Sequence, residues 1–466
     1  MPALSCGFTL PDLVKSQSYF LADLPPEASL TPQIITEACQ TLVRNRERFL
    51  LSRDTQSIIR SIAALAARWL EPEDPFRQQA LEHGPAATGF SRQTIETGLN
   101  DFFSQVTLPN LQNWVLQDFG HARRLDELSR SDDEQDTGRH SLAVGPPLLA
   151  HFCAGNLPNP AFMSIFSGLI VRSAQFVKCA SGSAFFVRLL GHSLHLLDSK
   201  LAACLEIAEW KGGSHPLEAA LFDGADCVTA AGNEESLLQI RKRVPPNKRF
   251  LGYGNRVSFA YITRESLAGA HAKTAAAQAA LDIIAWDQTG CLSPHVLYVE
   301  TGAESSPEEF AELLAQELEA LEYSRPRGAV SVEESAAIAI RRSVYEIRAA
   351  NSFETRMWRS ENSTAWTVIL EAEPQFQLSC LNRFVYVKPS GGLEQTLHAL
   401  EPVREQISTV GVAAPRHRLM EMAGRLARWG APRVCALGKM QKPPLAWRHD
   451  GRPVLADLVT WCDVET

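Results

Sequence analysis

Residues 148–183, LLAHFCAGNLPNPAFMSIFSGLIVRSAQFVKCASGS, decide the fold class of this chain. The apolar run Leu148–Cys153 has the length of a strand, Pro160–Arg172 has the length of a helix, and Gln175–Lys178 is again strand-like. A strand, a helix and a second strand in this order predict a βαβ unit, whose two strands lie parallel in one sheet.

The same alternation continues through the rest of the sequence. Further strands are expected at Asp226–Thr229, Arg249–Leu251, Val257–Ile262, His295–Val299, Ala365–Leu370 and Phe384–Lys388. Further helices are expected at about Ser183–Trp210, Glu234–Arg243, Ser266–Ala285, Pro307–Leu321 and Val332–Ala350. The pattern predicts an α/β protein with two α/β domains and largely parallel sheets.

Before about residue 145 the pattern is helical. Asp54 and Thr55 can cap a helix whose apolar residues fall on one face, at Ile58, Ile59, Ile62, Leu65 and Trp69. Residues 129–141 are polar enough for an exposed loop or hairpin.

Composition and charge exclude several classes of protein. The 466 residues are 45% apolar and 21% charged, which argues against a disordered or fibrous chain. The net charge of −8 argues against a nucleic-acid binder. The longest apolar run, Ala161–Val171, is too short to span a membrane, and the N-terminus does not resemble a secretory signal. We therefore expect a cytoplasmic protein without a membrane span.

The ten cysteines are scattered, with no two closer than the 23 residues between Cys204 and Cys227. Disulfide frameworks and metal sites usually show short paired spacings, so we expect reduced thiols and no metal site. Cys291 differs from the others because it lies in a polar loop, Ala285–His295, which contains glycine and proline. Two interpretations stay open on composition: a buried loop cysteine, or a presented nucleophile whose thiolate is favoured by nearby backbone N–H groups.

Two turns after predicted strands could approach a dinucleotide, Phe176–Ser183 and Val228–Ser236. Neither is a G-x-G-x-x-G fingerprint, and no phosphate-binding G-x-x-x-x-G-K-S/T motif occurs. The first turn contains Lys178, with no Asp or Glu between it and Asp198. A 2′-phosphate would meet no repulsion there, so the turn favours NADPH over NADH if a dinucleotide binds.

Several segments together resemble a known family. They are His151–Pro158, Lys178–Ser181, Phe250–Gly254, Asp287–Pro294, Arg433–Met440 and Trp447–Gly451. Their order resembles the acyl-CoA reductase family of bacterial bioluminescence (LuxC-like), a branch of the aldehyde dehydrogenase superfamily. The resemblance runs from about residue 145 to the end, and the first 145 residues match only loosely.

The resemblance implies an aldehyde-dehydrogenase-like fold. Residues 1–256 would form the helical N-terminal region and a Rossmann-like NAD(P)-binding domain, completed by 431–466. Residues 257–430 would form the α/β catalytic domain that carries the nucleophilic cysteine. Relatives in the superfamily assemble as oligomers, so a homo-oligomer is expected, and residues 129–141 could form its oligomerisation hairpin.

The resemblance also assigns site residues. Cys291 matches the nucleophile, and Asn156 matches the asparagine that forms an oxyanion hole with the backbone N–H of Cys291. Asn159 is the alternative, although it could equally cap a helix that begins at Pro160. Lys178 and Ser181 match residues that contact the adenosine ribose, and Ser181 replaces the glutamate of NAD-preferring relatives.

Three glycines match the coenzyme-binding segments of the superfamily. Gly232 matches the pyrophosphate turn, and Gly252 and Gly254 match the segment under the nicotinamide. A turn that needs positive φ, or close backbone packing, would explain these glycines almost as well.

One departure from the superfamily bears on the direction of the reaction. Hydrolytic relatives keep a glutamate about 35 residues before the nucleophile, but residues 246–258 contain no acid. Without that general base an acyl-enzyme should persist until hydride or a thiol reaches it. The expected activity is NADPH-dependent reduction of a fatty acyl thioester, either acyl-CoA or acyl-protein, to an aldehyde through acyl-Cys291.

Other functions and partners stay open. The alternatives are a hydrolytic NAD(P)-dependent aldehyde dehydrogenase, an acyl-phosphate reductase and a non-catalytic acyl-binding subunit. An acyl-protein synthetase or an acyl carrier protein would be the expected partner.

Overall fold

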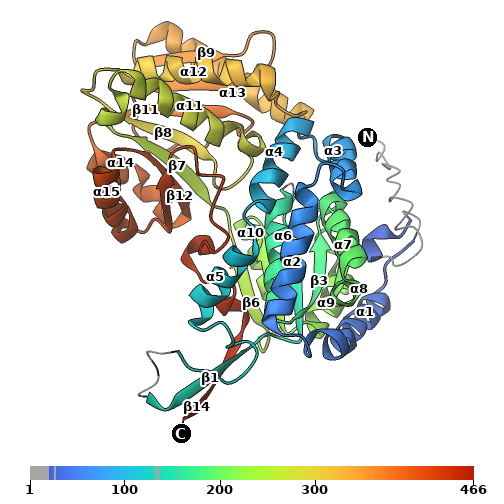
Figure 1. The fold of residues 1–466 in the computed structure, drawn as a ribbon. Coiled ribbons are helices and arrows are strands. Elements are labelled where there is room, and N and C mark those ends of the chain that lie inside the picture. The colour runs from blue at the N-terminus through green and yellow to red at the C-terminus, as the bar shows by residue number, and fades with distance from the viewer. Residues whose placement is uncertain (1–19, 26–27, 132–133, 135–136, 156, 466) are drawn as a thin grey trace. The chain divides into compact units, whose positions relative to one another are not determined.

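The computed structural model describes residues 20–25, 28–131, 134, 137–155 and 157–465. The chain forms two compact units (Figure 1). Unit 1 comprises residues 1–88, 99–254 and 444–466, and unit 2 comprises residues 89–98 and 255–443. Each unit contains a largely parallel sheet with helices on both faces, so the α/β fold class is confirmed. The division into domains at residues 256/257 and 430/431 stays a prediction.

Unit 1 contains a sheet of five parallel strands. Their spatial order is β4 (Leu205–Glu209), β3 (Ala174–Cys179), β2 (Leu148–Phe152), β5 (Cys227–Ala231) and β6 (Arg249–Tyr253). The chain winds outward from β2 in both directions, which places a topological switch point between β2 and β5. Ligands of doubly wound sheets bind beyond the carboxyl ends of the strands at such a point.

Helices cover both faces of this sheet (Figure 1). One face packs its apolar side chains against α1 (Pro32–Asn45), α9 (His215–Gly224) and α10 (Glu234–Arg243). The other face carries α6 (Pro158–Ile170) and α7 (Phe185–Leu197), against which α2 (Thr55–Leu70) packs. The remaining α-helices of unit 1 are α3 (Pro75–Thr88), α5 (Leu108–Phe119) and α8 (Ser199–Ala202), and α4 (Arg92–Phe103) has residues in both units.

Helix α2 begins where the sequence predicts. The Asp54 carboxylate accepts a hydrogen bond from the backbone N–H of Ser57 at 2.6 Å, as an N-cap residue does. All five residues of its predicted apolar face are fully buried: Ile58, Ile59, Ile62, Leu65 and Trp69. The cap and the apolar spacing therefore suffice to define this helix.

The single helix predicted over Ser183–Trp210 is wrong. Helix α7 ends before Asp198, whose backbone leaves the helical region at φ −149° and ψ 86°. The Asp198 carboxylate accepts the N–H of Leu201 at 3.1 Å and caps the short helix α8. The next apolar run becomes β4, which pairs with β3. The strand conformation of this segment depends on its pairing with β3, which the local spacing of apolar residues does not predict.

Glu206 on β4 is a partly buried acid with a strongly shifted pKa. Its Oε1 accepts the N–H groups of Leu21 at 2.8 Å and Ile207 at 3.0 Å. Burial raises the pKa of Glu206 from 4.5 to about 7. Between these two pH values the native carboxyl keeps its proton while the unfolded one loses it, so the free energy of unfolding falls as pH rises.

Glu206→Gln should therefore stabilise the protein more at pH 8 than at pH 4.5. The neutral amide avoids the buried negative charge, and one pKa unit corresponds to about 1.4 kcal/mol, so the gain should reach about 3 kcal/mol above pH 7. Urea unfolding of the two proteins at both pH values measures the difference. An equal effect at both pH values would contradict the prediction.

Unit 2 contains a seven-stranded sheet. The order is β13 (Arg433–Ala436), β12 (Ile407–Ala413), β7 (Val257–Ile262), β8 (Pro294–Glu300), β11 (Phe384–Ser390), β10 (Thr367–Glu371) and β9 (Thr355–Arg359). All neighbours are parallel except β9, which pairs antiparallel with β10 at the edge.

Apolar cores fill both faces of the unit 2 sheet. One face packs on α11 (Ala270–Ile284) and α12 (Pro307–Ser324). The other face packs on α13 (Val332–Asn351), α14 (Leu393–Leu400) and α15 (Arg416–Trp429).

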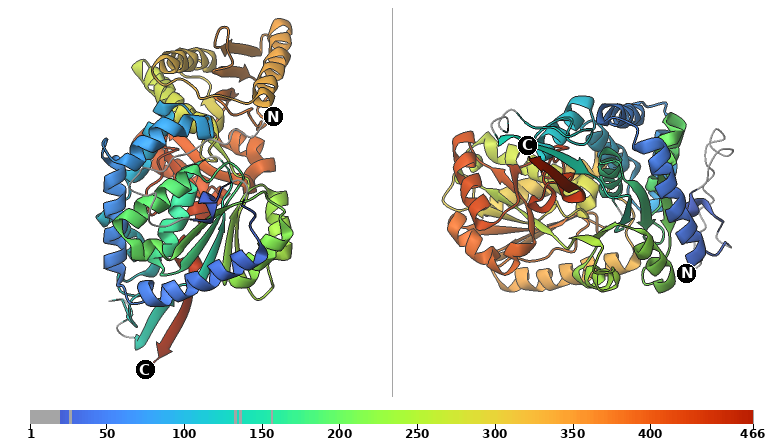
Figure 2. Two further views of the ribbon diagram at one scale, coloured as in Figure 1. Left: turned by 90° about the vertical axis from the view of Figure 1, so that its right-hand side faces the viewer. Right: turned by 90° about the horizontal axis from the view of Figure 1, so that it is seen from below.

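A two-stranded antiparallel pair, β1 (Arg139–Val144) with β14 (Thr460–Glu465), extends away from the five-stranded sheet of its own unit (Figures 1 and 2). The ring of Trp461 lies 5.8 Å from that of Phe119 and joins the pair to α5. Ser129 and Ser141 exchange backbone hydrogen bonds, as expected for a hairpin around residues 129–141. The homo-oligomer stays a prediction. In the described part of the chain no helix combines the length and apolar character needed to cross a membrane.

Candidate active site

Cys291 lies in the loop that enters β8, and its side chain is exposed. Its backbone oxygen accepts a hydrogen bond from the hydroxyl of Ser258 at 2.7 Å. The backbone N–H of Thr409 donates to the same hydroxyl at 3.1 Å. Strands β7 and β12 thus fix the backbone of the cysteine while its thiol is open to solvent. The exposure excludes the interpretation as a buried loop cysteine.

The three residues before the Cys291 turn have unusual backbone angles. Trp286, Asp287 and Gln288 have φ values of 50°, 50° and 65°. Left-handed backbone costs an L-residue about 1 kcal/mol or more, so a run of three needs contacts that enforce it. Trp286 provides one, because its buried ring meets that of Phe90 at 5.2 Å. Strained backbone of this kind is concentrated at functional sites.

Arg433 on β13 adds a positive charge that interacts electrostatically with Cys291. Its guanidinium donates to the backbone oxygens of Met440 at 2.6 Å and Lys439 at 2.8 Å. Burial lowers the pKa of Arg433, and one nearby carboxylate and two thiols, that of Cys291 among them, oppose that shift. Arg433 lies 142 positions from Cys291 in the sequence, so local reasoning missed it.

Of the two candidates for the oxyanion hole, Asn156 and Asn159, the structure describes only Asn159. Asn156 lies outside the described residues, and its role stays a prediction. Helix α6 begins at Pro158 with Leu157 as its N-cap, so the interpretation of Asn159 as an N-cap is wrong. The Asn159 side-chain oxygen is buried and has no hydrogen-bond partner among the described residues.

A small pocket, about 70 Å³ in volume, opens in unit 1 beyond the carboxyl ends of β2 and β3. Its walls include Cys153, Gly155, Cys179, Gly182, Ser183 and Phe186. The first of the two turns predicted to approach a dinucleotide therefore lines a pocket at the expected end of the sheet.

Lys178 on β3 directly precedes Cys179, which lines the pocket, and is 5% exposed. Its Nζ is 6.0 Å from the ring centre of Phe152 and 5.8 Å from that of Trp210. Burial lowers the pKa of the Lys178 amine. Ser181, in the turn that follows, is exposed.

Glu209, at the end of β4, is a residue that the sequence reasoning missed. Its carboxylate accepts the backbone N–H groups of Gly182 at 2.7 Å and Ala184 at 3.1 Å. Glu209 lies beyond the interval from Lys178 to Asp198, in which the sequence contains no acid. It reaches the turn because β4, which was predicted to be helix, pairs with β3. A carboxylate from β4 therefore lies against the turn after β3.

A comparison with protein families identifies the chain. The family model for acyl-CoA reductase (LuxC) matches residues 50–461. The chain belongs to the LuxC acyl-CoA reductase family. The resemblance seen in the sequence is thereby confirmed.

Curated relatives of this LuxC-family chain are long-chain acyl-protein thioester reductases. That of Photorhabdus luminescens is 23% identical over 88% of this chain and 82% of its own length. That of Aliivibrio fischeri is 23% identical over 93% of this chain and 86% of its own length.

Solved structures similar to the LuxC-family chain are enzymes with the aldehyde dehydrogenase fold. The putative aldehyde dehydrogenase PutA of Anabaena variabilis has a TM-score of 0.65 at 16% identity and covers 94% of this chain and 93% of its own. A bifunctional proline utilization A protein has a TM-score of 0.68 at 16% identity over 97% of this chain, which spans 46% of that longer protein. These likenesses confirm the predicted fold.

The three predicted coenzyme glycines of the LuxC-family chain are not left-handed. Gly232, Gly252 and Gly254 all have φ outside the positive region, so the alternative that they need positive φ is wrong. A methyl group at Gly252 would approach the ring of Phe250 to 3.0 Å, and one at Gly254 would clash with the carboxylate of Glu234. These neighbours are side chains and not backbone, and coenzyme contact stays a prediction for all three glycines. Among the described residues no group of three His, Cys, Asp or Glu side chains could hold a metal ion.

Glu209→Gln in this LuxC-family chain should shift coenzyme preference toward NADPH. Removing the negative charge that lies against the turn after β3 lowers the repulsion of a 2′-phosphate, so the ratio of kcat/KM for NADPH to that for NADH should rise about tenfold, or about 1.4 kcal/mol. Steady-state kinetics with both coenzymes measures the ratio, and Glu235→Gln, at the exposed start of α10, is the control. An unchanged ratio would show that Glu209 does not influence the coenzyme site.

Proposed function

We propose that this chain reduces a long-chain acyl thioester to the aldehyde with NADPH, through an acyl group carried on Cys291. The exposed Cys291 thiol on a backbone fixed by β7 and β12 is the observation that carries the proposal. Membership in a family of acyl reductases, and relatives named as long-chain acyl-protein thioester reductases, support the same reaction class.

The residues of unit 1 fit a nicotinamide dinucleotide. The pocket lies beyond the carboxyl ends of parallel strands, and Lys178 and Ser181 lie at the turn where an adenosine ribose would be held. At Gly155 and Gly182 the space beside the backbone is open, so a ligand could approach closely. Bound NADPH would supply the hydride that brings the acyl carbon to the aldehyde level.

The chain's own residues perform the remaining chemistry. The Cys291 thiolate forms a bond to the thioester carbonyl carbon, and the carbon–sulfur bond to the donor breaks, which releases the donor thiolate. Asn156 and the N–H of Cys291 would stabilise the oxyanion, a contribution of about 3 kcal/mol per donor. After reduction, cleavage of the bond to Cys291 releases the aldehyde and restores the thiolate. Because residues 246–258 contain no acid, this segment provides no general base, and water should be poorly activated to hydrolyse the acyl group.

The donor is acyl-CoA or an acylated protein, such as an acyl-protein synthetase or an acyl carrier protein. We place the reaction in the cytoplasm, and we infer that the chain works as a homo-oligomer.

Aldehyde formation tests the proposal. The protein is incubated with NADPH and an acyl-CoA series of graded chain length, and aldehyde and oxidised coenzyme are quantified. The expected result is one aldehyde for each NADPH oxidised. Aldehyde oxidation without CoA would favour the hydrolytic alternative, and reduction of an acyl phosphate alone would favour the acyl-phosphate alternative. Failure to bind NADPH in a fluorescence titration would favour a non-catalytic subunit.

A further inference from the structure

Two left-handed segments of unit 2 are joined by a buried ion pair. One is Trp286–Gln288, which leads into the Cys291 loop, and the other is Leu381–Arg383, whose φ values are 59°, 54° and 65°. Arg383 is 1% exposed and lies immediately before β11. Each segment consists of three consecutive non-glycine residues in a conformation that such residues rarely adopt, so each needs contacts that enforce it.

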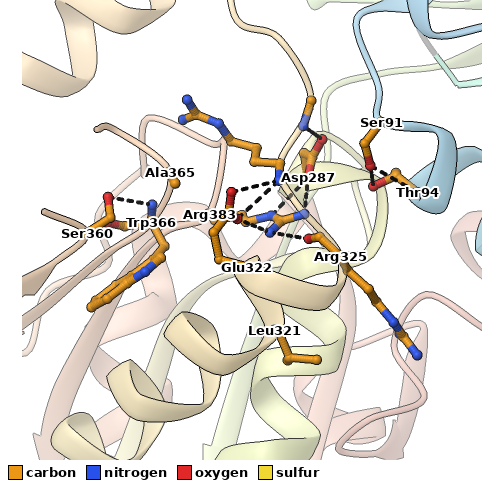
Figure 3. A network of polar contacts seen from close by, with 12 residues as sticks. Ser91, Thr94, Asp287, Leu321, Glu322, Arg325, Ser360, Ala365, Trp366 and Arg383 are labelled. Carbon is orange, nitrogen blue, oxygen red and sulfur yellow. Dashed lines mark hydrogen bonds and ion pairs between the residues drawn. The ribbon is translucent and has the colours of Figure 1, made fainter. Parts of the chain in front are cut away.

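The guanidinium of Arg383 makes these contacts (Figure 3). Its Nε donates to Oδ1 of Asp287 at 2.9 Å, and its Nη2 forms an ion pair with the same oxygen at 2.7 Å. Its Nη1 donates to Oε2 of Glu322 at 2.7 Å and to the backbone oxygen of Arg325 at 2.9 Å. The other oxygen of Asp287 accepts the N–H of Gly328 at 3.0 Å. Both ends of the pair are therefore fixed by further partners from the last turn of α12 and the residues that follow it.

Gln288 closes the loop around the cysteine. Its side-chain amide donates to the backbone oxygen of Pro294 at 2.8 Å and to that of Phe384 at 2.9 Å. Gln288 and Pro294 each lie three residues from Cys291, so this hydrogen bond joins the two ends of the loop at whose centre the thiol lies. The bond to Phe384 ties the same loop to the residue that follows Arg383.

We propose that Arg383 is a positioning residue for Cys291, acting through Asp287 to keep the left-handed segment that presents the thiol. The inference deepens the proposed function and rests on Cys291 being the acylated residue. A buried ion pair contributes little net stability compared with apolar packing, but it can specify one conformation. Here that conformation is the one that leads directly into the Cys291 loop.

Arg383→Met, with Arg342→Met as the matched control, tests the inference. Arg342 is also a buried arginine of unit 2, at 5% exposure, and it donates to Thr367 at 2.8 Å and to Trp366 at 2.7 Å. Two rates are measured for each full-length protein: single-turnover acylation of Cys291 by acyl-CoA, and alkylation of Cys291 by iodoacetamide. Circular dichroism and NADPH titration show whether each variant is folded.

Arg383→Met should slow acylation about a hundredfold, since a displacement of about 1 Å is enough for such a loss. Alkylation needs only an accessible thiol and should change less than about threefold. Arg342→Met should leave both rates within about twofold of wild type. A purely structural role of Arg383 would instead change alkylation and NADPH affinity together with acylation.

Asp287→Asn keeps the size of the side chain and removes its charge, so it decides the question if Arg383→Met does not fold. It should slow acylation about tenfold. Acylation at the wild-type rate in either folded variant would overturn the inference. Absence of acylation at Cys291 in the wild-type protein would instead overturn the proposed function, and that result is seen before any variant is compared.

Discussion

Cys291→Ser should lose acyl transfer and aldehyde formation by at least about a thousandfold. The reaction begins with a thiolate attacking the thioester carbon, and a serine hydroxyl at this position is a far weaker nucleophile. Removing a catalytic nucleophile can cost as much as removing the whole set of groups that act with it. The exposed side chain means that the substitution disturbs little packing, so the fold and NADPH binding should be retained.

Cys462→Ser is the matched control for this prediction. Cys462 lies on β14 and is also exposed, so it should be as reachable by acyl-CoA as Cys291 is. Single-turnover acylation and aldehyde release are measured for both variants. Equal loss in the two variants, or wild-type aldehyde formation in Cys291→Ser, would show that the nucleophile is elsewhere.

Lys178→Met should weaken NADPH binding at least about tenfold and NADH binding less than about threefold. Methionine keeps the unbranched apolar stem between the rings of Phe152 and Trp210 but removes the cation. The two coenzymes differ only in the 2′-phosphate, so a lysine that pairs with this phosphate must affect them unequally. A difference of tenfold corresponds to about 1.4 kcal/mol, which is modest for a charge-assisted contact.

Fluorescence titration with the two coenzymes measures this difference. Lys200→Met, on the exposed side of α8, controls for a general loss of positive charge. Equal weakening of both coenzymes by Lys178→Met would remove the argument for a 2′-phosphate site and leave Lys178 with a packing role.

Local sequence patterns predicted the helices and strands for which the capping residue or the spacing of apolar residues is clear. Helix α2 followed from the Asp54 cap and five apolar positions, and strand β7 was predicted with its observed limits, Val257–Ile262. Strand β4 was missed because its apolar residues continue the helical spacing of α7 across Asp198. Strands β9, β12 and β13 were also missed. Pairing with residues far along the chain determines such strands, and their intrinsic preference does not.

In the candidate site, too, local sequence patterns predicted only the residues whose role depends on their own segment. Cys291 could be singled out because its loop is polar and contains glycine and proline, which is local information. Arg433 and Glu209 come from other strands and Arg383 from the residue before another strand, and their relation to Cys291 or Lys178 exists only after the sheets have formed. No spacing rule connects residues that the fold brings together from positions 31 to 142 apart.

Peptide mapping by mass spectrometry after incubation with long-chain acyl-CoA tests the central claim most directly. Without NADPH, the acyl mass should be found on the peptide that contains Cys291. On addition of NADPH, that mass should disappear as an equal amount of aldehyde forms. Aldehyde formation with no acyl group on Cys291, or an acyl group on Cys291 that NADPH does not discharge, would contradict the account.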